Sequence, residues 1–282
     1  MRVTIAGFLT DYKSRVLLQQ PEPGRLLPVT ISLAAGMLPA DALVHAFRAA
    51  TGLVVWPVRL VGLYFAARDG GELTLTYRCT LRGGELQPLP DQPPAAFCNT
   101  APPPRGLSAA HARQLDDALH HAGGPALTAR PSGGLWDGLR SKGSQADDAP
   151  DWTATARLVV NAGHGQVAWT RGGPSEPWRL PAAVVGPGKA PWATAERLRR
   201  TLRLDWNGNR AVPQLITLAA DRPALTVVFA AELYGPSTPR GLGETVGFAA
   251  PDGLGEGFDA VDLALAAELL AAPDMTLVRL DA

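Results

Sequence analysis

The sequence contains the same order of predicted elements twice, and this internal repeat limits the fold more than any other feature. Residues 2–28 and residues 156–181 each begin with an alternating apolar segment and continue through a short polar turn into a second one. Both then reach a Pro- and Gly-rich loop that ends in Leu-Pro. The polar turns, at 11–14 and 163–166, contain residues that favour tight turns. The repeat therefore indicates two copies of one folding unit.

The remainder of each half also follows one order. A predicted helix comes first, then a long hairpin of two apolar strands, and then a closing helix. These segments are the helices 39–53 and 191–205, the hairpins 58–81 and 213–233, and the closing helices 107–122 and 259–272. Ser108 is the predicted N-terminal cap of the first closing helix.

Composition places the division between the halves. Residues 130–152 are rich in Gly, Ser, Asp and Pro, which is typical of a linker. We therefore expect a domain at 1–129, a linker at 130–152 and a second domain at 153–282, each of the α+β class with a mixed β-sheet flanked by helices. Two similar domains can pair as an intramolecular pseudo-dimer, and the sequence leaves open whether the chain also forms a homodimer.

Charge and hydropathy exclude several classes of partner. The formal net charge is zero, with 26 basic and 26 acidic residues, which argues against binding to nucleic acid or to an anionic membrane surface. No apolar run approaches the ~20 residues of a spanning helix, and the first residues alternate like a strand rather than a signal peptide. We expect a cytoplasmic protein. Cys79 and Cys98 have no metal-site spacing, and Cys79 is expected to be a buried apolar residue.

Several segments of the first half resemble the Nudix hydrolase family. They are the strand VTIAGFLTD, the segment VLLQQPEPGRLLP, the loop and helix at 36–53, and the hairpin that follows. The family signature runs Gly, five residues, Glu, seven residues, Arg-Glu, a hydrophobe, any residue, Glu-Glu, any residue, Gly, a hydrophobe. When Gly52 and Leu53 are aligned with its end, Phe47 takes the internal hydrophobic position. The resemblance implies two tandem Nudix-like domains.

The metal-binding glutamates of the family are missing from this alignment, so the Nudix box is degenerate. The positions of the single Glu, the Arg-Glu pair and the Glu-Glu pair fall on Met37, His45–Ala46 and Ala49–Ala50. In the family these glutamates hold Mg²⁺ or Mn²⁺ and activate water against a diphosphate, and hard cations need carboxylate oxygens. The resemblance therefore implies no metal, no other cofactor and no metal-dependent diphosphate hydrolysis in the first half.

The second half departs from the signature as well. Lys189, or Gly188 in a shifted alignment, takes the position of the first Glu. The helix that follows carries Glu196 among Arg197, Arg199 and Arg200, and one carboxylate among arginines cannot assemble a divalent site. Its basic side chains could attract a phosphate or carboxylate, or could form an ordinary solvated helix face.

Three side chains are candidates for acid–base catalysis. His45 replaces a polar signature position on the helix that borders the family's pocket. Glu22 lies in the Pro-rich loop that also borders it, and Glu232 ends the last strand of the second hairpin. Each has a plain alternative: His45 and Glu232 as exposed surface residues, and Glu22 as a partner of Arg25 that braces the loop.

The candidate substrate-binding residues are Arg25, Arg48, Trp178 and Arg179. Trp178 beside Arg179 can stack on a flat ring and pair with an anion, whereas a bracing role in the loop is the alternative. Two functions remain open. The chain is either an enzyme that acts on a small, ring-containing metabolite by metal-independent acid–base chemistry, or a catalytically silent pair of domains that binds a nucleotide-like ligand or a protein partner.

Overall fold

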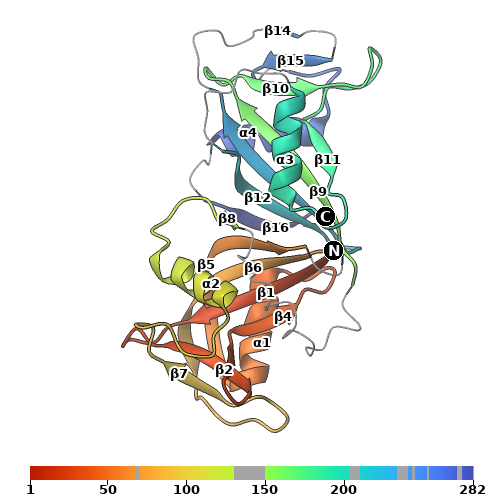
Figure 1. Cartoon of the computed structure of the whole chain (residues 1–282). Coiled ribbons are helices and arrows are strands. Elements are labelled where there is room, and N and C mark those ends of the chain that lie inside the picture. The colour runs from red at the N-terminus through yellow and green to blue at the C-terminus, as the bar shows by residue number, and fades with distance from the viewer. Residues whose placement is uncertain are drawn as a thin grey trace.

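The computed structural model describes residues 1–67, 70–129, 150–202, 210–233, 241–242, 245–252, 254–271 and 275–281. In Figure 1 the first half, red to yellow, lies below the second half, green to blue, and both termini are at the junction. The α+β class is confirmed, because each half combines a mixed β-sheet with helices. Most of the predicted linker, 130–149, is outside the described residues.

The first half is built around one mixed sheet with the strand order β4-β1-β6-β5-β8. Strands β1 and β6 run parallel, as do β5 and β8, while β5 and β6 form the long predicted hairpin. The elements of this half are β1 (Arg2–Leu9), β2 (Val16–Glu22), β3 (Arg25–Leu27), β4 (Val29–Ser32), α1 (Pro39–Thr51), β5 (Leu53–Ala66), β6 (Glu72–Gly84), β7 (Ala95–Cys98), α2 (Ala109–His120) and β8 (Leu127–Ala129).

Strand β2 does not extend the sheet of β1 as the first predicted strand–turn–strand unit suggested. It pairs antiparallel with β3 and β7 in a separate three-stranded sheet, and only an isolated bridge joins Thr10 to Val16. The physical reason is that β1 already pairs with β4 along one edge and with β6 along the other, so β2 has no free edge of β1 to join.

The second half repeats this plan in a sheet with the order β14-β15-β10-β9-β13-β12-β16, with β11 on β9. Here both strands of the first predicted strand–turn–strand unit lie in one sheet, because Val167 of β10 pairs with Asn161 of β9. The elements are β9 (Thr153–Asn161), β10 (Val167–Thr170), β11 (Ala182–Val184), α3 (Pro191–Thr201), β12 (Val212–Ala219), β13 (Ala224–Glu232), β14 (Gly241–Leu242), β15 (Val246–Ala249), α4 (Ala260–Ala271) and β16 (Leu277–Asp281).

All four predicted helices are present, and each is shorter than its predicted range. Ser108 caps α2, since its hydroxyl accepts a hydrogen bond from the backbone N–H of His111 at 3.2 Å. Helix α1 begins at a proline and ends at Gly52, whose left-handed φ of 76° suits a residue without a side chain. No helix in the described part of the chain is both long and apolar enough to cross a membrane.

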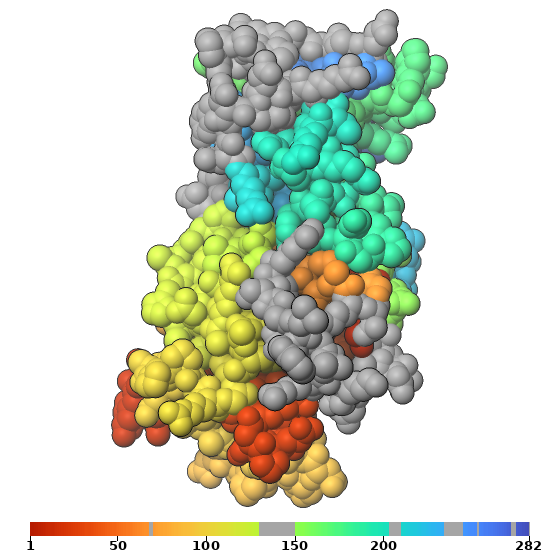
Figure 2. Space-filling model, in the orientation of Figure 1, coloured from red at the N-terminus to blue at the C-terminus, as the bar shows by residue number. Residues whose placement is uncertain are grey.

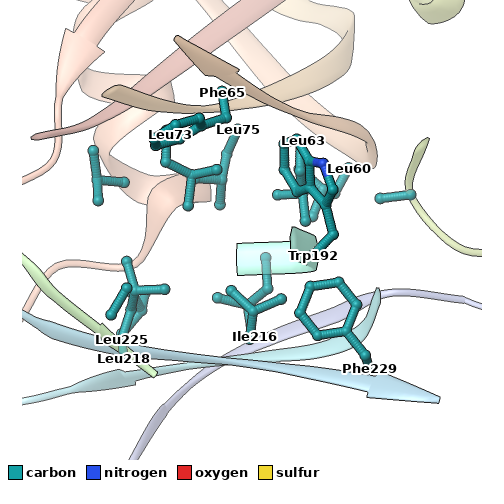
Figure 3. Close-up of a cluster of buried hydrophobic side chains, with 14 of the residues drawn as sticks. Leu60, Leu63, Phe65, Leu73, Leu75, Trp192, Ile216, Leu218, Leu225 and Phe229 are labelled. Atoms are coloured by element: carbon teal, nitrogen blue, oxygen red, sulfur yellow. The ribbon is translucent and has the colours of Figure 1, made fainter. Parts of the chain in front are cut away.

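The two halves share one hydrophobic core. Side chains of the first sheet, among them Leu63 and Leu73, face side chains of the second sheet, among them Ile216 and Leu225, and Trp192 of α3 lies between them (Figure 3). The inward faces of α1 and α3 belong to the same core. Helices α2 and α4 cover smaller clusters on the outer faces of their sheets. The junction is therefore a packed interior rather than a contact of two finished surfaces.

Reciprocal loop contacts join the halves. The backbone of Gly36, before α1, approaches the carbonyl of Ala220 in the β12–β13 hairpin, where an added Cβ would stand 2.7 Å from the carbonyl oxygen. The backbone N–H of Gly188, before α3, donates to the carbonyl of Gly70 in the β5–β6 hairpin. Figure 2 shows the teal residues around α3 against the orange residues of that hairpin. In each half, the loop before the first helix therefore contacts the long hairpin of the other half.

The end of the predicted linker is part of the folded body. Trp152 is buried, and its backbone N–H donates to the carbonyl of Met1 at 2.7 Å. Its indole N–H donates to the carbonyl of Leu33 at 3.2 Å. An indole N–H usually finds a partner when it is buried, and here the partner belongs to the other half. Trp152 therefore attaches the start of the second half to the first.

Candidate functional site

In the alignment with the Nudix signature, the hydrophobic positions of α1 are filled by buried apolar residues. The glutamate positions carry no side chain that could bind a metal. Leu43 and Phe47 are fully buried against the sheet. The glutamate positions hold the side chains of Met37, Ala46, Ala49 and Ala50, which offer no oxygen atom. A site for Mg²⁺ requires several oxygen ligands. These four positions therefore supply no ligand for a divalent cation.

Helix α3 carries one carboxylate, that of Glu196, and two arginine side chains contact it. Glu196 accepts hydrogen bonds from Nε and Nη2 of Arg199 at 2.8 and 2.6 Å, and Nε of Arg200 lies 3.4 Å away. The hydrogen bond from Arg199 lowers the pKa of Glu196, with the Arg199 charge adding to it. Within the residues that the structure describes, no three His, Cys, Asp or Glu side chains gather in a way that could hold a metal ion.

The three acid–base candidates lie on separate elements. His45 is on the exposed face of α1, and Glu22 is exposed at the end of β2. Glu232 is exposed at the end of β13, in register with Asn161. Residue Ala224, at the start of the same strand, is adjacent to the junction of the halves, so Glu232 lies roughly 26 Å along the strand from there. No single site therefore contains Glu232 together with the other two.

The two candidate binding residues of the first half are also on its surface. Nη1 of Arg25 lies 3.5 Å from Oε1 of Glu22, whose side chain is 65% exposed, so this pair spans the turn between β2 and β3. Arg48 is exposed in the last turn of α1, where a cation interacts favourably with the helix dipole. Neither residue lines either of the two pockets described below.

A pocket of about 370 Å³ in the second half contains Trp178, and we call it the Trp178 pocket. Pockets that bind small molecules begin near this size. It lies between the loop after β10 and the loop before α4, which a parallel bridge between Trp178 and Phe258 holds together. Its lining residues are Arg171, Pro174, Ser175, Glu176, Pro177, Trp178, Glu256, Gly257 and Phe258.

Two side chains contact the ring of Trp178. Phe258 stacks on one face, with ring centroids 6.2 Å apart and an angle of 22° between the rings. The Arg171 guanidinium lies 4.6 Å from the ring centroid. Arg171 also donates to the carbonyl of Pro174 at 3.2 Å. Trp178 therefore serves as a platform that orients the Arg171 cation. Its role as a surface for a ligand ring stays a prediction.

The cation nearest to Trp178 is not the one that the sequence suggested. Arg179 is 62% exposed and its Nε lies 3.6 Å from a carboxylate oxygen of Asp259. Arg171 was missed because it precedes the Pro-rich loop and is seven positions from Trp178. The isolated bridge between Thr170 and Arg179 explains the contact, since it folds the loop back on itself and brings Arg171 beside Trp178.

A buried ion pair supports the wall of the Trp178 pocket. Asp262, in the first turn of α4, is 2% exposed and accepts a hydrogen bond from the backbone N–H of Leu180 at 2.9 Å. Its other oxygen lies 2.5 Å from Nη1 of Arg157 on β9. Burial raises the pKa of Asp262, and the Arg157 charge opposes this only in part. The pair ties the end of the loop to the sheet beneath it.

Comparisons with known proteins find similarity at the level of solved structures. No family model and no curated protein matches the chain. An ADP-ribose pyrophosphatase from Streptococcus suis is 19% identical with a TM-score of 0.39, covering 45% of this chain and 98% of that one. A MutT protein from Bacillus halodurans is 17% identical with a TM-score of 0.40, covering 46% and 90%.

A third similar structure is a Nudix-family hydrolase from Clostridium perfringens, 14% identical with a TM-score of 0.37, covering 43% of this chain and 97% of that one. Each of these proteins therefore matches a length of about half of the chain. The TM-scores of these three structures are all below 0.5, so the similarities carry no argument about the fold or the activity of this chain.

Proposed function

We propose that this chain is a ligand-binding protein that has lost metal-dependent diphosphate hydrolysis, and that it binds a small, ring-containing, nucleotide-like anion in the Trp178 pocket. The observation that carries the proposal is the Arg171 guanidinium held on the Trp178 ring at the wall of a pocket large enough for such a ligand. The absence of side-chain oxygen ligands at Met37, before α1, and at Ala46, Ala49 and Ala50 on α1 supports the loss of hydrolysis.

The lining of the pocket supports this class of ligand. A guanidinium pairs with phosphate or carboxylate groups and also stacks on planar rings. The carboxylates of Glu176 and Glu256 can accept hydrogen bonds from sugar hydroxyls or from ring N–H groups. A nucleotide-like molecule carries all of these groups.

A second function, acid–base conversion of the same ligand without a metal, is favoured by one observation. Two carboxylates line the Trp178 pocket beside the cation, and a carboxylate can act as a general base. His45, Glu22 and Glu232 do not line this pocket, so they cannot act as acid or base on a ligand bound in it. Binding without conversion is therefore the function that the geometry supports best.

Replacing Arg171 with glutamine is expected to weaken binding of ADP by at least about tenfold, because a charge-assisted hydrogen bond contributes about 1.5–3 kcal/mol. Isothermal titration calorimetry with ADP in the presence of EDTA measures the change. The matched control is Arg200→Gln, which removes an arginine that is 76% exposed on α3 and should leave the affinity unchanged. Wild-type protein that does not bind ADP, or equal effects of the two substitutions, would contradict the proposal.

The loss of hydrolysis is tested separately with ADP-ribose as the probe. We expect chromatography to recover ADP-ribose intact after incubation with the protein and Mg²⁺. Products that form with Mg²⁺ and disappear with EDTA would show that the chain retains the metal-dependent reaction. Products that form equally with EDTA would favour the acid–base alternative over silent binding.

A further inference from the structure

Tyr77 on β6 is a buried tyrosine whose hydroxyl has no hydrogen-bond partner in the described part of the chain, although the residue is only 5% exposed. Buried polar side chains usually have a partner, so an unpaired phenol is unusual. Burial raises the pKa of Tyr77, so the phenol stays protonated near neutral pH and can donate a hydrogen bond. Its oxygen is not among the unpaired atoms that are fully closed off from solvent.

Tyr64, on the other strand of the same hairpin, shows the ordinary arrangement. It is 2% exposed, and its hydroxyl donates to the carboxylate of Asp117 on α2. This bond joins α2 to the sheet. The hydroxyl of Tyr77 joins nothing within the described part of the chain, so the fold gives no reason for a tyrosine rather than a phenylalanine there.

Tyr77 lines a pocket of about 180 Å³ between the two halves, which we call the Tyr77 pocket. Its lining residues are Ala40, Pro57, Val58, Arg59, Leu60, Tyr77, Gly124, Met275, Thr276, Leu277 and Val278. Because β6 is paired with β1 along one edge and with β5 along the other, Tyr77 faces the pocket with its side chain. The pocket is therefore the space from which solvent reaches the hydroxyl.

Arg59 brings a positive charge to the edge of the same pocket. It precedes Leu60, which pairs with Tyr77. Nη1 of Arg59 donates to the carbonyl of His121 at 3.2 Å, at the start of the loop that also provides Gly124. Among the described residues no carboxylate forms an ion pair with Arg59. The other donors of the guanidinium can therefore bind an anion.

The rest of the lining is largely apolar. The Thr276 hydroxyl is already engaged, because it donates to the carbonyl of Pro213 and accepts from the backbone N–H of Ala126. The aliphatic members are Ala40, Pro57, Val58, Leu60, Met275, Leu277 and Val278. The side-chain groups left to bind a ligand are thus two donors, one of them charged, in an apolar surround.

This combination selects both ends of a ligand. A carboxylate has two oxygens that only accept hydrogen bonds, which matches one phenol and one guanidinium. An apolar body matches the aliphatic lining. We propose that the Tyr77 pocket binds a small apolar carboxylate, which accepts a hydrogen bond from Tyr77 and pairs with Arg59. This site is separate from the Trp178 pocket and does not depend on the function proposed for it.

The test uses benzoate as the probe and the full-length chain. Isothermal titration calorimetry is expected to find one benzoate bound per chain. Benzamide has the same ring but no charge, so it should bind at least about tenfold more weakly, because hydrogen bonds to a charged group are the stronger ones. Wild-type protein that does not bind benzoate, or equal affinities for the two compounds, would overturn the proposal.

Two tyrosine substitutions separate binding from folding. Tyr77→Phe should weaken binding of benzoate by at least about tenfold and leave the urea midpoint no lower than that of the wild type, because no protein group loses a partner. The matched control, Tyr64→Phe, should lower the urea midpoint, since Asp117 loses its donor, and leave the affinity unchanged. Unchanged affinity of Tyr77→Phe would contradict the proposal.

Two arginine substitutions test the charge in the same way. Arg59→Gln should weaken binding of benzoate by at least about tenfold. Arg78 pairs with Arg59 in the strand register but is exposed and does not line the pocket, so Arg78→Gln should bind benzoate as the wild type does. Equal losses in both variants would point to general attraction of anions instead of this site.

A last measurement needs no substitution and locates the probe. The chain has three methionines, and only Met275 lines the Tyr77 pocket. With ¹³C-methyl methionine, we expect benzoate to shift the Met275 methyl resonance through its ring current and to leave that of the exposed Met37 unchanged. No shift at Met275, or equal shifts at both methionines, would count against the site.

Discussion

Replacing Trp192 with alanine is expected to lower the free energy of unfolding by about 3–5 kcal/mol, the range for removing a large buried aromatic side chain. The loss is expected to be large because Trp192 touches both halves in the shared core, where its ring meets Phe65 edge-on. A void at this point would open the interior that joins the two sheets. Urea denaturation followed by circular dichroism measures the change, and a single transition would indicate that the halves unfold together.

The matched control is another tryptophan on the surface. Trp56 on β5 is 55% exposed and lies beneath the guanidinium of Arg82, with 4.9 Å from the guanidinium carbon to the ring centroid. Trp56→Ala should cost no more than about 1 kcal/mol, the scale of an exposed cation–π contact. If the two substitutions had equal effects, or if Trp192→Ala changed only one of two separate transitions, the junction would not be the shared interior described above.

Much of the fold could be predicted because its signals are local. Alternating apolar residues, turn residues and a serine cap identified the paired hairpins and the closing helices of both halves. The separate sheet of β2 could not be predicted, because the pairing of β1 with β4 and β6 is decided by residues distant in the sequence. The apolar side chains that join the halves could not be predicted either, because the sequence does not indicate whether an apolar residue packs within its own half or against the other half.

The candidate site was also predictable only in part, because its contacts join residues that are not adjacent in the sequence. Trp178 was identified from its loop and does line a pocket, but the cation on its ring is Arg171 rather than the adjacent Arg179. The sequence suggested Arg179 because it is adjacent to Trp178. The contact of Arg171 with Trp178 depends instead on the bridge between Thr170 and Arg179, which folds the loop back. Whether His45, Glu22 and Glu232 act in catalysis stays a prediction, with the added requirement that Glu232 acts at a different place from the other two.

Removing the carboxylate of Asp262 is expected to have an effect similar in size to the loss of Trp192. In Asp262→Leu the partly buried Arg157 guanidinium would lose its counter-charge and the backbone N–H of Leu180 would lose its acceptor. Leaving one member of a buried ion pair alone costs about 3–5 kcal/mol. The lower end is expected here, because the Arg157 side chain is 26% exposed and water can reach part of it. Urea denaturation of the variant measures this loss.

Two further variants separate charge from packing at this position. The double substitution Arg157→Leu/Asp262→Leu should recover part of the loss, since no unpaired charge remains. In Asp262→Asn the side-chain oxygen can still accept from Leu180, so it should be more stable than Asp262→Leu. A double variant that is less stable than either single one would show that the pair stabilises the fold by its charge, which contradicts this account.

The pH dependence of stability gives an independent check on Asp262. Because burial raises its pKa in the folded chain above the ordinary value of 3.8, the folded state holds this proton more tightly than the unfolded state does. The contribution of Asp262 to stability is therefore fully present below pH 3.8 and is lost as the pH rises through the raised pKa. The free energy of unfolding of Asp262→Asn should lack this downward step in urea titrations across that range. A variant with the same pH profile as the wild type would mean that another group titrates there.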